Sequence, residues 1–475
     1  MTGLSDKKRW VLLIILVSYL MIVLDISIVI TGLPQISADL HFSTAALSWV
    51  QNAYTLAFGG LLLLGARAGD ILGRKRMFLT GLSLFTLASL IVGLAPTADF
   101  MLASRALQGI GAAILAPSTL ALLTTNFAEG PERNNAVSYY GATAGFAASL
   151  GLVAGGIFAG WLSWRVGFFI NLPIGILLFI GARKYIVETE KHTGQFDLFG
   201  ALSSTVGMSL LVYGIVRSSE EGLADSYAQL TLFTGVLLMI IFVINEWKAK
   251  QPIMPLRLFT HKGRNAALIA RMLFLGASIS FWFFTTQILQ NVVGLSSLET
   301  GFAFLSTTLP QFIAAINIPK LTRRYNNARV LTISLGIFAL GLFWLSQINE
   351  HSDYLVGVFM PMMLIGIGQG GAIGPLTVAG IADVPQKDAG AASGLVNVAH
   401  QFGSSVGLAI LIVIFSSFQD PQLSLRGQLA HQISAALVGG TIMAIVAMLI
   451  CWFAIGKNQE PEKSHLPDVA ENINA

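Results

Sequence analysis

Long apolar runs alternate with short polar connections along most of the chain. A helix needs roughly 17–25 mostly apolar residues to cross a bilayer, and fourteen runs are candidates for such a span. They lie near residues 10–33, 47–65, 77–95, 101–123, 136–160, 166–185, 198–216, 228–245, 265–290, 300–318, 330–347, 354–380, 391–418 and 433–456. The pattern predicts an all-α membrane protein with fourteen transmembrane helices. The connections are too short to hold a soluble catalytic domain.

Positively charged residues follow the same alternation. Lys and Arg are enriched in the cytoplasmic loops of membrane proteins. If the N-terminus is cytoplasmic, only Arg165, Arg217 and Arg426 of the 28 Lys and Arg residues fall on the other side, and Arg105 and Arg271 lie within spans. A missed span would reverse the alternation after it. We therefore predict a multi-pass membrane protein with both termini cytoplasmic.

The longest cytoplasmic connections divide the chain into two halves. They lie at about 184–197 and 246–264 and bracket the seventh and eighth runs. Six runs remain on either side, and repeated halves are common in transporters. We predict a six-helix bundle at 1–185, two additional helices with a cytoplasmic loop at 186–264, a second six-helix bundle at 265–456 and a cytoplasmic tail at 457–475.

A faint internal repeat supports this division. The segments "RAGDILGRKRMFLT" (67–80) and "PKLTRRYNNARVLT" (319–332) both connect the second and third spans of their half. This alignment pairs Asp70 with Thr322. The likeness is weak in sequence but occupies the same place in each half.

Composition excludes several classes of protein. The mean hydropathy is +0.72 and only 11% of the residues are charged, whereas soluble domains carry about 25%. The net charge of +4 does not indicate nucleic-acid binding, because the basic residues lie between hydrophobic runs. Cys451 is the only cysteine, so no disulfide forms within the chain. No nucleophile–base pair, metal-ligand cluster or nucleotide site is evident, and we expect no enzyme activity, metal or cofactor.

Asp25 is the only Asp or Glu deep within a predicted span. An ionised carboxylate there costs about 2.5–3.5 kcal/mol on insertion scales. At 1.5 Å per residue, Asp25 lies about 8 Å and Arg105 about 6–8 Å from the same edge of the membrane core. Gln108 follows Arg105 by one turn and can share its donors. If the first and fourth spans touch, these residues form either a proton-coupling site or a satisfied structural ion pair.

Other polar residues within the spans have less specific interpretations. Arg271 lies some six residues into its span, and we expect its side chain to snorkel to the interface. His400 shares a helix face with Asn397, Gln401 and Ser404. A hydrogen-bonded structural histidine is favoured, and a second titratable group or a polar contact for a substrate is the alternative.

Aromatic and glycine-rich runs complete the candidate features. The four aromatic residues at 281–284 are consecutive, so some are expected to face lipid, about half of the run forming an interfacial belt. Those on the face of Gln287 are candidates for a cavity. The glycine-rich segments at 141–160 and 366–375 are expected mainly to pack helices closely.

Several motifs together resemble one family. "LDISIVITGLP" (24–34), "GARAGDILGRKR" (65–76), "LASRALQGIGAA" (102–113), "SWRVGFFINLPIG" (163–175) and "PIMPLRLF" (252–259) are similar to signatures of the fourteen-span drug:proton antiporter branch of the major facilitator superfamily. The likeness covers nearly the whole chain. The fifth-span motif, usually Gly-Pro-x-x-Gly-Gly, reads "GLVAGG" (151–156) here, with Leu152 in the proline position.

The resemblance implies roles for the matched residues. Asp25 and Arg105 would couple proton movement to transport. Asp70, Gly73 and Arg74 would form a cytoplasmic latch, with Asp70 at the N-terminus of the thirteenth span near Gly390 and Ala391, where a helix dipole favours a carboxylate. Gly151, Gly155 and Gly156 would form the gating motif of the fifth span. Candidate residues for the substrate cavity are Asp25, Tyr54, Gln108, Trp282, Gln287, Asn397 and His400.

The sequence therefore predicts a major facilitator fold, with two six-helix bundles and two extra central helices. The expected function is secondary active export of amphipathic, cationic or neutral drugs or toxic compounds in exchange for protons, by a monomer in the lipid bilayer, which the resemblance implies is the bacterial cytoplasmic (inner) membrane. The alternatives within transport are a dedicated exporter of one metabolite or siderophore, and a facilitator without proton coupling, given Leu152. A membrane sensor or scaffold is disfavoured because Asp25, Arg105 and His400 are present.

Overall fold

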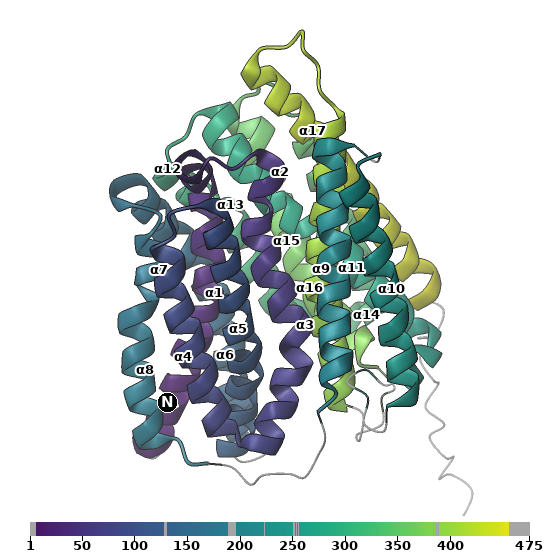
Figure 1. Cartoon of the computed structure of the whole chain (residues 1–475). Coiled ribbons are helices and arrows are strands. Elements are labelled where there is room, and N and C mark those ends of the chain that lie inside the picture. Colours follow the sequence, from purple (N-terminus) through teal and green to yellow (C-terminus); the bar gives the residue numbers. More distant parts are fainter. Residues whose placement is uncertain are drawn as a thin grey trace, which may run out of the picture.

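The computed structural model describes residues 6–127, 131–188, 196–222, 224–249, 252, 254, 256–382, 384 and 389–455. The regular elements in this part of the chain are all helices (Figure 1). Thirteen helical segments in it are long and apolar enough to cross a membrane. A fourteenth is formed by α6 (Pro131–Ile157), which continues into the short helix η1 (Phe158–Leu162). The predicted all-α fold is therefore confirmed, and the spans agree with the fourteen apolar runs.

The first group of spans consists of α1 and α3–α8, with the short helix α2 before α3. Their bounds are α1 (Asp6–Leu40), α2 (Thr44–Leu47), α3 (Trp49–Leu72), α4 (Arg74–Gly93), α5 (Ala98–Asn126), α7 (Val166–Phe169) and α8 (Asn171–Tyr185). Helix α5 packs against α3 and α4, and α1 packs against α6 and α8. These contacts build one six-span bundle.

The second group consists of the spans from α11 onward. Their bounds are η2 (Leu256–Thr260), α11 (Lys262–Gln287), η3 (Ile288–Val293), α12 (Ser297–Ala303), α13 (Leu305–Tyr325), α14 (Asn327–Leu345), η4 (Leu355–Phe359), α15 (Met360–Gly380), α16 (Ala389–Ser417), α17 (Leu425–Ile450) and η6 (Cys451–Ile455). Helix α11 packs against α15, α16 and α17, so it lies inside this bundle.

The two additional helices, α9 (Leu198–Glu221) and α10 (Ser226–Lys248), form a pair beside the bundles (Figure 1). Helix α9 contacts α3 of the first bundle and α16 of the second. Helix α10 is peripheral and exposes Phe233, Ile240 and Trp247. The pair therefore lies against the junction of the two bundles.

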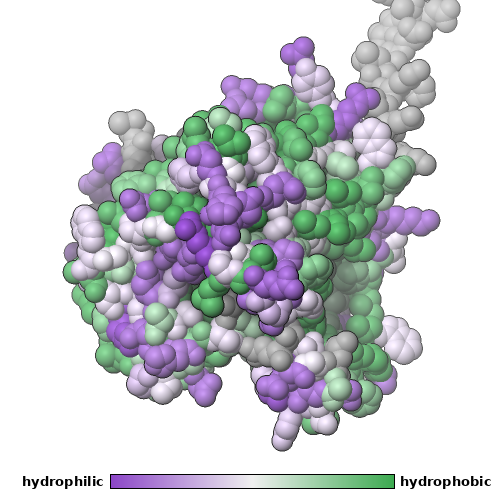
Figure 2. Space-filling view, turned by 90° about the horizontal axis from the view of Figure 1, so that it is seen from above, coloured by the Kyte–Doolittle hydropathy of each residue, from purple (hydrophilic) through white to green (hydrophobic). Residues whose placement is uncertain are grey.

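Two ends of the molecule are distinguished by their residues. The basic end, at the bottom of Figure 1, carries the start of α1, the turn between α3 and α4, the end of α8 and the start of α11. Figure 2 views the other end from above. Hydrophilic side chains gather over the middle of that face, and hydrophobic ones border it on the right. Below, this second face is called the opposite end.

Glycines allow several helices to approach closely. A Cβ on Gly65 would lie 2.1 Å from the Ala113 carbonyl oxygen, and one on Gly155 would lie 2.4 Å from Thr31 Oγ1. Between α11 and α16, a Cβ on Gly407 would lie 2.2 Å from the Cα of Gly276. Close backbone packing is the usual use of small residues between helices in lipid. The predicted packing role of the glycine-rich segment at 141–160 is confirmed in its second part.

The two bundles contact each other along α3 and α16, where a Cβ on Gly394 would lie 2.0 Å from the Leu63 side chain, and also toward the opposite end. Cβ atoms on Gly156 of α6 and Gly301 of α12 would lie 2.4 Å and 2.7 Å from the carbonyl oxygens of Ser297 and Leu152. The Gln290 side chain donates to the Thr31 carbonyl at 3.0 Å. Helices α1, α6, α12 and η3 are therefore held together at this end.

The turn geometry corrects the alignment of the internal repeat. Gly73 lies between α3 and α4 with φ +107°, and Asn326 lies between α13 and α14 with φ +73°. Each backbone N–H donates to the carbonyl four residues earlier, on Gly69 and Thr322. The equivalent of Asp70 is thus Arg323, one residue beyond the predicted Thr322. The register of the alignment is set by the conformation of the turn, which the amino-acid sequence alone did not show.

The aromatic run on α11 differs from its prediction. Phe281, Phe283 and Phe284 are fully buried, and only Trp282 is partly exposed. Helix α11 is enclosed by α15, α16 and α17 and also contacts α1. The expectation that about half of the run faces an interface was wrong because neighbouring helices cover several faces of α11.

Candidate functional site

Asp25 lies at the centre of a buried polar cluster in the first bundle. Its side chain is 1% exposed. Oδ2 accepts a hydrogen bond from Arg105 Nη1 at 2.8 Å. Oδ1 accepts from Gln108 Nε2 at 2.8 Å and from Asn171 Nδ2 at 2.9 Å. The first and fourth spans do touch, which the sequence had left open, and the carboxylate is held by donors from α5 and α8.

Arg105 is itself fully buried and held in place from several sides. Nη1 also donates to Gln108 Oε1 at 2.6 Å, and Nε donates to the Val50 carbonyl at 3.1 Å. The guanidinium carbon lies 4.4 Å from the centre of the Tyr54 ring. A cation over an aromatic face is stabilised further when it is desolvated. Tyr54 therefore supports Arg105 from α3.

Asn171 was missing from the predicted site. It is the first residue of α8 and is fully buried. Its amide also lies 3.3 Å from Ser89 Oγ, which accepts from Gln108 at 2.7 Å. The signal in the sequence was an isolated amide in the apolar motif "FFINLPIG". Its partner was not derivable, because the motif gives no information on which helix α8 contacts.

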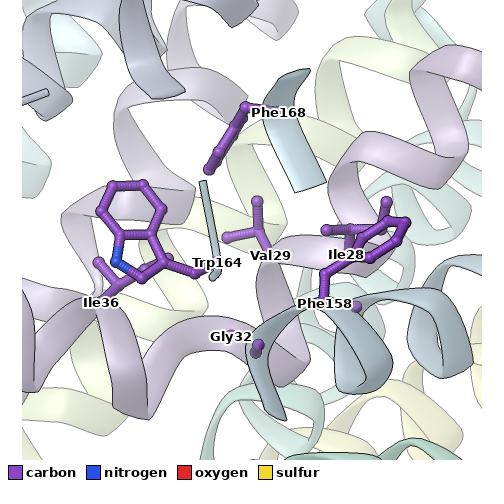
Figure 3. Close-up of a pocket in the computed structure, with 9 residues that line it drawn as sticks. Ile28, Val29, Gly32, Ile36, Phe158, Trp164 and Phe168 are labelled. Carbon is purple, nitrogen blue, oxygen red and sulfur yellow. The ribbon is translucent and has the colours of Figure 1, made fainter. Parts of the chain in front are cut away.

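An apolar crevice lies next to this cluster toward the opposite end (Figure 3). Its lining includes Ile28, Val29 and Gly32 of α1 together with Trp164 and Phe168. It has essentially no free volume for a water molecule. Phe168 also lies beside Arg105, with 5.7 Å between the centre of its ring and the guanidinium carbon. The polar cluster is therefore bordered by a dry apolar layer on this side.

The predicted latch residues lie together at the basic end. Arg74 Nη2 donates to Asp70 Oδ1 at 3.1 Å, and Nη1 donates to the Ala121 carbonyl at 3.2 Å. Gly73 provides the positive φ that starts α4. The backbone of α16 is described at Gly390 and Ala391, where Asp70 was expected to dock, but the side chains around them are not, so the latch remains a prediction.

A second carboxylate, missed in the sequence, supports this turn. Glu188 accepts from the backbone N–H of Lys75 at 2.9 Å and from that of Arg76 at 3.1 Å. A Cβ on Gly73 would lie 2.7 Å from its carboxylate carbon. Backbone N–H groups at a helix start favour an anion, so Glu188 caps α4 after the end of α8.

Arg271 corrects another prediction. It is 5% exposed, and Nη1 donates to Thr377 Oγ1 at 2.9 Å while Nη2 contacts His400 Nδ1 at 3.3 Å. The expected snorkelling side chain was wrong, because α15 and α16 enclose the guanidinium. His400 is hydrogen-bonded, as the favoured interpretation predicted. Its role toward a substrate stays a prediction at this point.

The remaining predicted cavity residues occupy different surroundings. Trp282 packs against Phe304, with ring centres 5.0 Å apart. Gln287 is buried and accepts from Asn291 at 3.0 Å. Asn397 is exposed on α16. Residues on α11 and α16 are thus not gathered with Asp25, whereas Tyr54 and Gln108 are.

A separate cavity of about 400 Å³ lies where the two additional helices meet the bundles. Helices α3, α9, α10, α11 and α16 contribute to its walls. Its lining is mostly apolar and includes Met208, Met239, Phe242, Met272 and Phe402. No sequence motif predicted it, because it forms only where helices from three parts of the chain meet.

Comparison with known families gives a match across the chain. The model of the Major Facilitator Superfamily matches residues 15–408 and, in a second match, residues 267–471. Among solved structures, a bacterial homologue of the human lysosomal transporter Spinster, in an inward-facing and unoccupied conformation, has a TM-score of 0.68 and 13% identity over 97% of this chain and 100% of that one. The nucleoside transporter NupG has a TM-score of 0.63 and 12% identity over 96% and 100%. These two similarities support the fold.

Curated relatives are more similar in sequence. The cephamycin export protein CmcT of Amycolatopsis lactamdurans is 38% identical over 99% of this chain and 97% of its own. The puromycin resistance protein pur8 of Streptomyces alboniger is 34% identical over 96% and 90%. The multidrug resistance protein Stp of Mycobacterium tuberculosis is 31% identical over 85% and 75%. All three are named for export of, or resistance to, antibiotics or drugs.

Proposed function

The chain belongs to the major facilitator superfamily, and we propose that it exports amphipathic drugs or toxic compounds in exchange for protons. Its relatives include proteins named for cephamycin export, puromycin resistance and multidrug resistance, which supports a drug or toxin exporter. A transporter of this kind is not an enzyme. Without a nucleotide motif in the sequence, an ion gradient is the expected source of energy.

The observation that carries the proposal is the buried cluster around Asp25. Its carboxylate is charge-paired with Arg105 and receives two further donors, from Gln108 and Asn171. A proton on this carboxylate would weaken the charge-assisted bonds that hold it. Protonation would therefore favour a rearrangement of α1 relative to α5 and α8, and the reverse rearrangement would favour release of the proton.

Helix α1 connects this cluster to the contact between the bundles. Thr31 lies six residues after Asp25, and its carbonyl accepts from Gln290 of the second bundle. Gln35, one turn further, contacts Gln290 and Ser297. A movement of α1 driven at Asp25 would therefore change the contacts that hold the opposite end together. This gives proton loading a physical route to alternating access.

The orientation follows from the charges. The basic end carries Lys8, Arg74 and Lys184, and we place it in the cytoplasm according to the positive-inside rule. The opposite end would then face outward, with its helices packed together in this structure. Asp70 and Arg74 would act as a latch on the cytoplasmic side in the other state. A monomer contains all of these parts.

The structure changes the argument about the charge of the substrate. The expectation of cationic or neutral compounds followed the family resemblance and was tied to no particular residue. Asp25 is fully engaged by Arg105, Gln108 and Asn171. The first bundle thus offers no uncompensated negative charge at this position, and the substrate charge has to be argued from other residues.

A dedicated exporter of a single metabolite is the second candidate. It is favoured by the relative with 38% identity over nearly the full length of both chains, which is named for export of one antibiotic. A panel of structurally unrelated compounds separates the candidates, because a dedicated exporter would transport only one chemical class.

The proposed coupling is tested in proteoliposomes with an imposed pH gradient and a panel of amphipathic dyes. Asp25→Asn is expected to abolish gradient-driven export, and size-exclusion chromatography of the purified variant checks that it remains folded. Asp39→Asn is the matched control, because Asp39 lies on the same helix and pairs with Arg165 near its end. It is expected to retain export. Normal gradient-driven export by Asp25→Asn would refute the assignment.

A further inference from the structure

Arg271 has few partners for a buried cation. It lies on α11, nine residues after the helix begins, which is about 14 Å along the helix axis. Its guanidinium reaches between Thr377 of α15 and His400 of α16. Within the described residues no carboxylate pairs with it, whereas Arg105 in the first bundle is paired with Asp25. The second bundle therefore contains a deep positive charge that nothing described neutralises.

The hydrogen-bonding capacity of Arg271 is also incompletely used. A guanidinium has five N–H donors. One contacts Thr377 and one contacts His400, and Nε is buried with no partner among the residues that the structure describes. Burying an unpaired charge is strongly unfavourable, and ionisable groups within a membrane usually mark a pathway or a binding site. The free donors and the free charge both indicate an anionic ligand.

The surroundings of Arg271 add donors and few acceptors. A guanidinium cannot accept a hydrogen bond, so His400 Nδ1 accepts and its proton is on Nε2. That Nε2–H is then available to donate. Thr377 Oγ1 donates to the Ile373 carbonyl while it accepts from Arg271. The arrangement suits a ligand that accepts hydrogen bonds and carries negative charge.

The site is accessible to a ligand from its edges. Thr377 and His400 are half-buried and Asn397, one turn before His400 on α16, is exposed. On α15, Ile373 is exposed, and a Cβ on Gly374 would meet nothing within 4 Å. Open space therefore borders the residues that hold the guanidinium.

We propose that Arg271, Thr377 and His400 form a subsite that binds the carboxylate of an amphipathic substrate. This rests on the proposed export function and names the substrate class of the same transporter. A guanidinium matches a planar carboxylate through two parallel hydrogen bonds. One cation balances one negative charge, so a monocarboxylate fits better than a phosphate dianion. The unpaired charge of Arg271 would favour the binding of acidic compounds. The Asp25 carboxylate gives cations no such advantage, because Arg105 already neutralises it.

The test compares two probes that differ by one negative charge. Rhodamine B carries a free carboxylate, and its methyl ester does not. Binding to the purified full-length protein in detergent is measured by fluorescence anisotropy without a pH gradient. The wild type is expected to bind the acid about tenfold more tightly than the ester, the ratio expected when one charge-assisted hydrogen bond is gained.

Variants separate a binding role from a structural one. Arg271→Gln is expected to bring the affinity for the acid down to that for the ester and to leave the ester unchanged. Arg271→Lys keeps the charge and is expected to retain part of the preference. Arg264→Gln is the control, since Arg264 is also buried on α11 but donates to the carbonyls of Leu258 and Ala382. It is expected to keep the full preference.

Two results would overturn the subsite. One is a wild type that binds the acid no more tightly than the ester. The other is an equal loss of affinity for the acid and the ester in both Arg271→Gln and Arg271→Lys, which would show that Arg271 has a structural role. Binding needs no gradient, so this test does not depend on proton coupling. If the wild type prefers the acid but Asp25→Asn still exports normally, the subsite stands and the assignment of proton coupling to Asp25 fails.

Discussion

Removal of the Arg105 charge alone is expected to destabilise the protein more than removal of both charges of its pair. In Arg105→Met the Asp25 carboxylate stays buried, with only Gln108 and Asn171 as donors. Breaking a buried pair by removing one partner costs about 3–5 kcal/mol. The Nε bond to the Val50 carbonyl is lost as well and contributes about 1 kcal/mol. The single variant is therefore expected to lose roughly 4–6 kcal/mol.

The double variant Asp25→Asn with Arg105→Met removes the unpaired charge. The amide introduced by Asp25→Asn would still offer one oxygen to the donors of Gln108 and Asn171, so most of the penalty of the buried carboxylate is expected to disappear. The coupling between the two substitutions is expected to be about 2–3 kcal/mol in favour of the double variant.

The assay is heat treatment of the detergent-solubilised protein, followed by size-exclusion chromatography of the fraction that remains monodisperse. Wild type, both single variants and the double variant complete the cycle. The double variant is expected to survive to a higher temperature than Arg105→Met. If the two single effects simply add, the pair contributes no coupling and the description of the cluster as a charge-balanced unit is wrong.

The other predictions concern the helix contacts and the latch. In Gly155→Val even the added Cβ would lie 2.4 Å from Thr31 Oγ1, so the yield of monodisperse protein is expected to fall severalfold. Gly374→Ala is the control, because its Cβ would meet nothing within 4 Å, and its yield is expected to match the wild type. Gln290→Leu removes the donor to the Thr31 carbonyl, and labelling by a membrane-impermeant reagent of a cysteine introduced at the opposite end is expected to become faster; unchanged labelling would argue against this contact as part of the closed state. Asp70→Asn weakens the pair with Arg74 and is expected to slow export at saturating substrate with little change in binding. Export at the wild-type rate would refute the latch role of Asp70.

The sequence predicted the depth of charged groups better than their partners. Contact between the first and fourth spans was left open, but the similar depth of Asp25 and Arg105 was foreseeable because the rise of a helix is constant and the two spans enter the membrane from opposite sides. The Asn171 contact was not, because it depends on how α8 packs against α1 and α4. Ser89 joined the cluster for the same reason.

Enclosure by neighbouring helices explains the two errors on α11. Arg271 lies near a helix end in sequence, which favours snorkelling, but α15 and α16 cover it. The three phenylalanines of the same helix are buried for the same reason, so the predicted interfacial belt was wrong. A hydrophobic run looks alike whether it faces lipid or protein, so the sequence alone could not tell which faces were covered.

Proton release on substrate binding tests the central claim most directly. The purified protein is held in lightly buffered detergent with a pH-sensitive dye, and an amphipathic substrate that it transports is added. The wild type is expected to release protons into solution, because substrate and proton compete through the Asp25 cluster, and Asp25→Asn is expected to release none. Equal proton release from Asp25→Asn and the wild type would contradict that claim.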